Sequence, residues 1–145
     1  MSKSVRPRER QNVELARVLL VDDDPASRLT LQTVLRAGGY RVDSAASAAE
    51  AVSLLDDSEY ELVLTDLQME SPEAGLRVLA HARLMDYKPA TALITTYRET
   101  RQKRGASKKN SPSVLIEPED LPALLTKVAD LVSERATKRV QRSLR

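Results

Sequence analysis

The chain has 145 residues, enough for one domain that buries about two-thirds of the surface exposed by its unfolded form. It contains no cysteine, which excludes disulfides, thiolate metal sites and cysteine nucleophiles, and fits a reducing compartment. No stretch approaches the roughly 20 apolar residues needed to cross a bilayer, and no signal-peptide pattern opens the chain. We therefore expect a soluble, cytoplasmic protein that makes no membrane contact.

The net charge of +2 conceals two basic ends around an acidic centre. Residues 1–10 carry +3 and residues 135–145 carry +5, which leaves −6 for residues 11–134. We expect a disordered basic tail over residues 1–15, one domain over 16–134, and a basic C-terminal tail over 135–145. Solvated tails that aid solubility are favoured over contacts with nucleic acid or anionic lipid.

Five short runs rich in Val, Leu and Ile predict β-strands. The third run is almost continuously apolar, as in a strand covered on both faces. The expected strands are Arg17–Val21, Tyr40–Ala45, Tyr60–Thr65, Ala90–Thr95 and Ser113–Ile116.

Helix signals follow each of these runs. Asp24 is a favourable N-cap before Pro25, and Gly38-Gly39 ends the helix that they begin. Ser47 and Glu50 form a capping box at the start of the second helix. The other three helices are expected from Ser71-Pro72 through Leu84, from Arg98 to Lys109, and from Asp120 through Val132 with a broad apolar stripe.

This alternation of strands and helices predicts an α/β fold: a parallel sheet with helices on both faces and right-handed crossovers. The flavodoxin-like strand order 2-1-3-4-5 is the natural form with five strands, a (βα)5 three-layer sandwich. It places the first and third strands side by side.

Carboxylates stand where those two strands end. Asp22, Asp23 and Asp24 follow the first strand directly, and Asp66 follows the third. Ligands of open parallel sheets bind at the carboxyl ends of the strands. Clustered carboxylates are costly there unless a cation neutralises them, and oxygen-only ligands suit Mg²⁺. The sequence therefore predicts a Mg²⁺ pocket, with Asp24 more simply interpreted as a helix cap.

Four segments resemble the receiver domain of two-component response regulators, the chemotaxis-type module, over roughly residues 16–134. They are Val-Leu-Leu-Val-Asp-Asp-Asp-Pro from Val18, Leu-Val-Leu-Thr-Asp-Leu-Gln-Met from Leu62, Leu-Ile-Thr-Thr from Leu93, and Ile-Glu-Pro from Ile116. Their order and spacing match together, which is more specific than any one segment alone.

The resemblance implies a phosphorelay function rather than an enzyme with its own substrate. Asp66 would accept a phosphoryl group from a histidine kinase or phosphotransfer protein. Asp22, Asp23, Asp66 and the backbone carbonyl of Gln68 would bind Mg²⁺, and Thr95 would contact the phosphoryl group and act as the switch. In such transfers the protein chiefly positions groups and neutralises charge.

Departures from the family pattern affect the switch. Glu117 replaces the lysine that precedes the proline after strand five, which removes a positive charge and adds a negative one beside the acceptor. Val114 stands where the family often has an aromatic ring. The loop after Asp66 is longer and adds Glu70 and Glu73. We therefore expect impaired phosphorylation, by about a hundredfold or more.

Two alternatives remain open. A pseudo-receiver would act as a constitutive protein-interaction module, independent of phosphorylation. Asp22-x-Asp24 also resembles the opening motif of haloacid-dehalogenase-type phosphatases, but Ala26 stands where Thr or Val is expected, and no lysine motif or cap segment follows. The lone His81 is interpreted as a surface or packing residue.

The family's docking face consists of the fourth helix, the fifth strand and the fifth helix, where a downstream protein would bind. The expected helix from Arg98 to Lys109 carries six basic residues and one acid, Glu99, so a basic docking surface is one interpretation and a solvated helix the other. No segment resembling an output domain follows, so the chain is either a stand-alone receiver or a fragment of a longer regulator.

Overall fold

A five-stranded parallel sheet with the order β2-β1-β3-β4-β5 forms the centre of the domain. The computed structural model describes residues 15–66, 69–71, 73–94, 114–116 and 121–144. The strands are β1 (Arg17–Val21), β2 (Arg41–Ala45), β3 (Leu62–Asp66), β4 (Ala90–Ile94) and β5 (Val114–Ile116). Both the flavodoxin-like fold class and the predicted strand order are confirmed.

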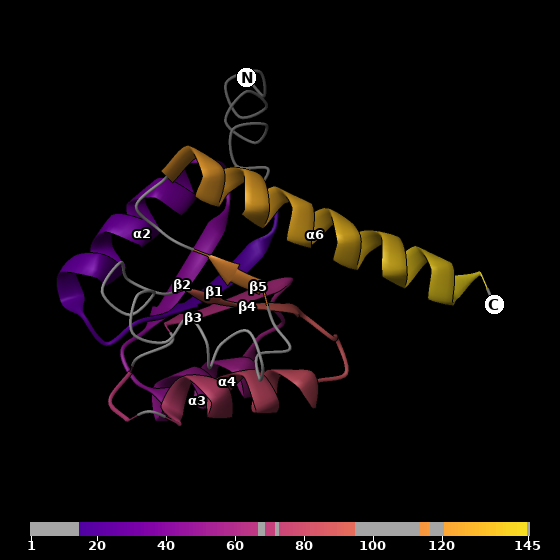
Figure 1. The fold of residues 1–145 in the computed structure, drawn as a ribbon. Helices are drawn as coiled ribbons and strands as arrows, with labels where there is room; N and C mark the ends of the chain where they lie inside the picture. The colour runs from indigo at the N-terminus through magenta and orange to yellow at the C-terminus, as the bar shows by residue number, and fades with distance from the viewer. Residues whose placement is uncertain (1–14, 67–68, 72, 95–113, 117–120, 145) are drawn as a thin grey trace, which may run out of the picture.

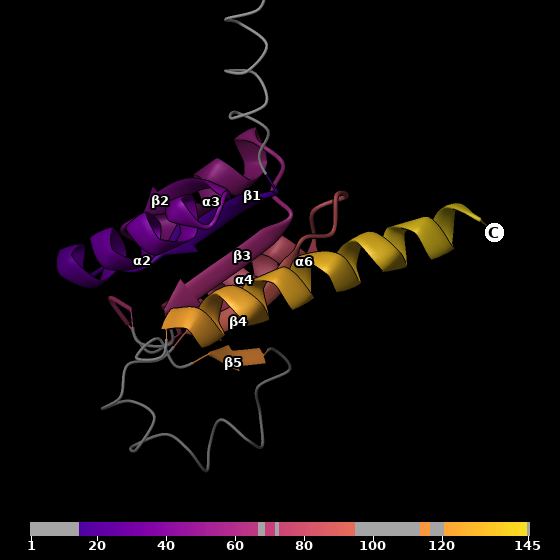
Figure 2. The same cartoon turned by 90° about the horizontal axis from the view of Figure 1, so that it is seen from above.

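Helices cover the two faces of the sheet in pairs. Within the described residues these helices are α2 (Pro25–Ala37), α3 (Ala48–Asp57), α4 (Ala74–Arg83) and α6 (Leu121–Ser143). As Figures 1 and 2 show, α2 and α6 lie on one face, and α3 and α4 on the other. No helix among the described residues combines the length and apolarity that a membrane span requires.

Successive side chains of β1 point to opposite faces of the sheet, so the core lies in two layers. Val18 and Leu20 pack with buried residues of α2 and α6, whereas Leu19 and Val21 pack with those of α3 and α4. All five residues of β3 are buried, as the prediction of a strand covered on both faces required. The sheet is therefore held from both sides, which fixes the positions of the strand ends.

The predicted caps of α2 are present. Asp24 Oδ2 accepts a hydrogen bond from the backbone N–H of Ser27 at 2.9 Å. The helix ends at Gly38, and Gly39 adopts a φ of +103°, a left-handed conformation that favours glycine.

The capping box of α3 is confirmed with one shift. Ser47 Oγ accepts from the N–H of Glu50 at 3.1 Å, but Glu50 Oε1 accepts from the N–H of Ala46 at 2.8 Å rather than from that of Ser47.

The helix boundaries differ from expectation at two places. α4 begins at Ala74 rather than at Ser71-Pro72, and its N-cap residue Glu73 makes no side-chain capping bond. α6 continues through Ser143, so residues 135–143 extend the last helix instead of forming a separate tail. The expected helix from Arg98 to Lys109, the cap at Asp120 and the tail over residues 1–14 lie outside the described residues.

Candidate functional site

Register brings the ends of β1 and β3 to the same edge of the sheet. Val21 pairs with Thr65, so the residues that follow, Asp22 and Asp66, emerge side by side. The N–H of Asp22 also donates to Ala45 O of β2 at 3.0 Å, which fixes the start of the turn. The carboxyl ends of three strands thus hold the backbone from which the acidic side chains project.

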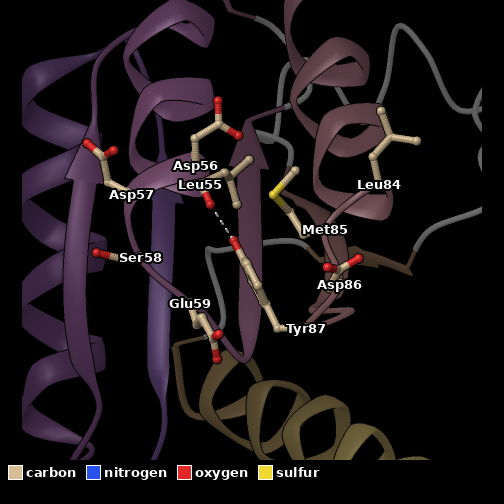
Figure 3. A pocket seen from close by; sticks show the side chains of 9 residues that line it. All are labelled: Leu55, Asp56, Asp57, Ser58, Glu59, Leu84, Met85, Asp86 and Tyr87. Atoms are coloured by element: carbon tan, nitrogen blue, oxygen red, sulfur yellow. Dashed lines mark hydrogen bonds between the residues drawn. The ribbon is translucent and has the colours of Figure 1, made fainter.

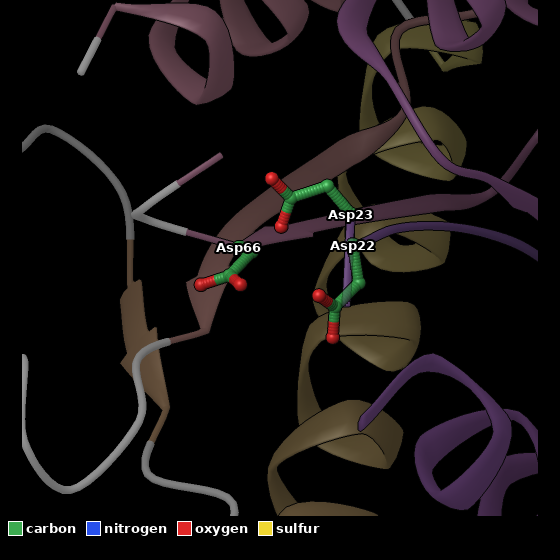
Figure 4. A group of neighbouring side chains, drawn as sticks. All are labelled: Asp22, Asp23 and Asp66. Atoms are coloured by element: carbon green, nitrogen blue, oxygen red, sulfur yellow. The ribbon is translucent and has the colours of Figure 1, made fainter. Parts of the chain in front are cut away.

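Three carboxylates meet at this edge. Oxygen atoms of Asp22, Asp23 and Asp66 all lie within 4.8 Å of one another, and Figure 4 shows the three side chains gathered at the strand ends. Asp22 is 2% exposed and Asp66 is 7% exposed, whereas Asp23 is open to solvent. The structure therefore brings together the three acids that the strand pattern selected.

The carboxylate of Asp24 is not part of this cluster, because local hydrogen bonds direct it to the start of α2. Its backbone N–H donates to Asp22 Oδ1 at 3.0 Å, while its own carboxylate caps α2. Arg28 Nη1 donates to the backbone carbonyl of Asp22 at 2.8 Å and ties the first turn of α2 to the strand end. Asp24 is a helix cap, as predicted, and Arg28 is a support that the sequence pattern did not reveal.

The cluster carries an excess of negative charge. Partial burial raises the pKa of the Asp23 carboxyl above its ordinary value, and the neighbouring charges of Asp22 and Glu70 add to the effect. The Asp23 side chain is nevertheless open to solvent. The charges of Asp22 and Glu70 thus add to the cost of ionising Asp23.

Such a group of donors fits Mg²⁺. The ion prefers oxygen ligands and commonly takes one or two carboxylates together with water. Asp22 and Asp66 offer buried carboxylates and Asp23 a more accessible one, from two adjacent strands. A divalent cation would offset the repulsion that raises the pKa of Asp23.

Gly75 allows α4 to approach the acidic strand end. A Cβ at this position would lie 2.6 Å from the backbone oxygen of Asp66, which is closer than side-chain atoms pack against backbone. The glycine that follows the Asp66 loop is therefore needed for close contact, a role that its place inside a helix did not indicate.

Replacing Gly75 by alanine is expected to destabilise the protein by about 1–3 kcal/mol, because α4 or the end of β3 must move. Alanine otherwise favours a helix by about 1 kcal/mol, so a net loss would isolate the clash. Urea unfolding of Gly75→Ala measures it, with Arg77→Ala, at an exposed position of the same helix, as control. Equal or greater stability of Gly75→Ala would contradict this account.

The loop after Asp66 reaches a neighbouring helix. Glu70 Oε2 accepts a hydrogen bond from the N–H of Ala48 at 3.1 Å, at the start of α3, where a negative charge is favourable. Met69 beside it is buried. The sequence indicated Glu70 only as an extra acid. Its contact with Ala48 could not be predicted from local patterns, because the two residues are 22 positions apart in the chain.

Three of the predicted site residues lie outside the described part of the chain: Gln68, Thr95 and Glu117. The strands beside them are described. Asp66 pairs with Ile94 of β4, and Ile94 pairs with Ile116 of β5. His81 is not part of the acidic cluster; its Nε2 lies 2.8 Å from Asp56 Oδ1 and joins α4 to α3.

A sequence profile of the response regulator receiver domain matches residues 18–129. The chain belongs to this family. Receiver domains are signalling modules of two-component systems, and they generally interact with histidine kinases or phosphotransfer proteins and bind Mg²⁺ at an acidic pocket.

Among its relatives is the transcriptional regulatory protein GlrR of Escherichia coli, 29% identical over 83% of this chain. The match spans only 27% of that protein's length. A solved receiver protein from Sinorhizobium medicae is 26% identical with a TM-score of 0.68, covering 82% of this chain and 95% of that one. The response regulator TrrA of Thermotoga maritima, solved with Mg²⁺ and BeF, is 28% identical with a TM-score of 0.66, covering 81% and 99%.

Proposed function

We propose that this receiver domain accepts a phosphoryl group on Asp66, with Mg²⁺ held by Asp22, Asp23, Asp66 and the backbone carbonyl of Gln68. The cluster of three carboxylates within 4.8 Å at the carboxyl ends of β1 and β3 carries the proposal. Added support comes from the Thermotoga relative, which was solved with Mg²⁺ and BeF.

The chemistry follows from the positions of these groups. A carboxylate oxygen of Asp66 attacks the phosphorus of a phosphohistidine, an O–P bond forms and the N–P bond breaks, and the imidazole nitrogen leaves. Asp22 and Asp23 position the cation, whose charge offsets that of the incoming phosphoryl group. Thr95, which follows Ile94 at the end of β4, would donate its hydroxyl to a phosphoryl oxygen.

Glu117 sets the expected efficiency. A lysine at this position would supply a charge-assisted hydrogen bond of about 1.5–3 kcal/mol to the phosphoryl group. A carboxylate instead repels it, by roughly 3 kcal/mol at about 5 Å and an effective dielectric of 20. The domain is therefore proposed as a slow acceptor.

A second candidate function is a pseudo-receiver that binds a partner constitutively. Two features of the sequence favour it: Glu117 at the lysine position and Val114 in place of a ring that turns on activation. For the phosphoacceptor, the proposed cytoplasmic partners are a histidine kinase or phosphotransfer protein and a downstream protein, whereas a pseudo-receiver would bind its partner protein independently of phosphorylation. The downstream protein would dock at the face that the family forms from its fourth helix, fifth strand and fifth helix, to which β5 and α6 belong.

Incubation with acetyl phosphate tests the proposal directly. Wild-type protein should gain the mass of one phosphoryl group only when Mg²⁺ is present, and Asp66→Asn should gain none. Asp130→Asn, which changes an exposed carboxylate of α6, serves as the matched control and should label like wild type. Absence of an adduct in wild type under conditions where Glu117→Lys is labelled would favour the pseudo-receiver.

A further inference from the structure

The far half of α6 projects past the amino edge of the sheet, opposite to the acidic cluster (Figures 1 and 2). Over the sheet, the inner face of this helix carries the buried residues Leu124, Val128 and Leu131. Continued at the same helical spacing, that face changes from apolar to basic: Arg135, Lys138, Arg139 and Arg142. If these cations served only to keep the helix end in solution, they would not need to lie on the continuation of the buried face.

Arg135 anchors this overhanging segment to the domain. Its Nε donates to Lys88 O at 3.0 Å and its Nη2 to Tyr87 O at 2.7 Å, in the turn that precedes β4. Burial lowers the pKa of Arg135, and the positive charge of Arg139 lowers it further. The overhang is thus held in place by hydrogen bonds despite repulsion among its own cations.

Two adjoining hollows lie beneath the overhang, with volumes of about 330 and 420 Å³. They share Lys88 and Arg142, and Glu134 and Asp86 are the acids among their lining residues. Arg83 also lines one of the hollows, and the cations that define this basic lobe are the five beneath or on the overhang: Lys88, Arg135, Lys138, Arg139 and Arg142.

An acidic hollow of about 400 Å³ adjoins the basic lobe, at the ends of α3 and α4 (Figure 3). It shares Asp86 and Tyr87 with the basic side, and the Tyr87 hydroxyl donates to Leu55 O at 2.8 Å. Burial, together with Glu59 and Asp56, raises the pKa of Tyr87 to about 12. The acid lobe is defined by the exposed carboxylates Asp56, Asp57, Glu59 and Asp86.

We propose that this amino edge is a homodimer surface, in which the acid lobe of each copy receives the basic lobe of the other. In a two-fold contact the same patch occurs on both sides, so the patch must complement itself. An acidic half beside a basic half, joined at the turn of Tyr87 and Lys88, meets that requirement when the axis passes near the turn.

A nucleic acid fits this surface less well. Its phosphates could contact the basic lobe, but they would then lie against the four carboxylates of the acid lobe, which repel them. A second copy satisfies both lobes in one contact. The surface lies at the opposite edge of the sheet from Asp66, so this inference does not depend on the proposed phosphorylation.

Sedimentation of the full chain over a range of protein concentrations tests the proposal. Dimers should form at about 0.05 M salt and weaken at about 0.5 M, where charges are screened over a few ångströms. Lys138→Glu with Arg142→Glu should weaken self-association about tenfold or more, and so should Asp57→Lys with Asp86→Lys. None of these four residues supports the fold through a hydrogen bond described above.

The decisive arm mixes the two double variants. Each variant is repelled by its own kind. In the mixed pair, the reversed basic lobe of one variant faces the reversed acid lobe of the other, and the intact acid lobe faces the intact basic lobe, so both contacts attract and a heterodimer should form. Arg77→Glu with Lys127→Glu, at exposed positions of α4 and of the first half of α6, should dimerise like wild type. A wild-type monomer at low salt, a mixture that stays monomeric, or a monomer that binds a short DNA duplex would overturn the proposal.

Discussion

Replacing Glu117 by lysine is expected to accelerate Mg²⁺-dependent phosphorylation of Asp66 by about a hundredfold or more. Two contributions add: the repulsion between a carboxylate and the incoming phosphoryl group disappears, and an ammonium group can donate to it. Ile116, the residue that precedes Glu117 in the chain, is in line with Ile94 and Asp66 across β5, β4 and β3. Single-turnover labelling with acetyl phosphate, followed by intact mass, gives the rate.

Glu117→Gln separates the two contributions. It removes the negative charge without adding a positive one, so its rate should lie between those of wild type and Glu117→Lys. If the glutamine variant already reached the rate of the lysine variant, repulsion alone would limit the wild type. If neither variant labelled faster than wild type, Glu117 would have no influence on the reaction, and our account of slow transfer would be wrong.

Most of the fold follows from local patterns that agree with one another. The run Arg17–Val21 ends at an acid, and Asp24 and Pro25 then begin a helix that stops at Gly38. Each signal is short-range, and together they require the crossovers that place β1 beside β3. The meeting of Asp22, Asp23 and Asp66 was therefore predictable, since it depends only on strand order and on where two strands end.

The features that escaped prediction depend on contacts between distant segments. Glu70 reaches the start of α3, and the backbone oxygen of Asp66 leaves no room for a Cβ at Gly75. The extension of α6 was missed for another reason. Residues 135–143 lack an apolar face, but Arg, Lys, Ala and Gln favour helix, and propagation is cheap once packing has formed the first turns.

Replacing Asp22 by asparagine should change stability in opposite directions with and without Mg²⁺. Without the ion, the variant should be more stable than wild type by about 1–3 kcal/mol, because one of three charges within 4.8 Å is lost. Asparagine keeps an oxygen for the N–H of Asp24, so the turn is retained. With saturating Mg²⁺ the order should reverse, because the ion stabilises only a folded protein that binds it.

The pH dependence measures a related cost, because partial burial and the neighbouring carboxylates together raise the pKa of Asp23. The pKa of Asp23 is raised above 3.8 in the folded protein, so the folded state holds this proton more tightly than the unfolded state does. Metal-free wild type should therefore lose stability as pH rises from 3.8 through that raised pKa, and Asp23→Asn should lose less. Urea unfolding across this window, with Asp130→Asn as control, measures the difference.

The same unfolding measurement with and without Mg²⁺ tests the prediction for Asp22. If Mg²⁺ stabilised Asp22→Asn as strongly as wild type, Asp22 would not be a ligand, and the pocket would need another explanation.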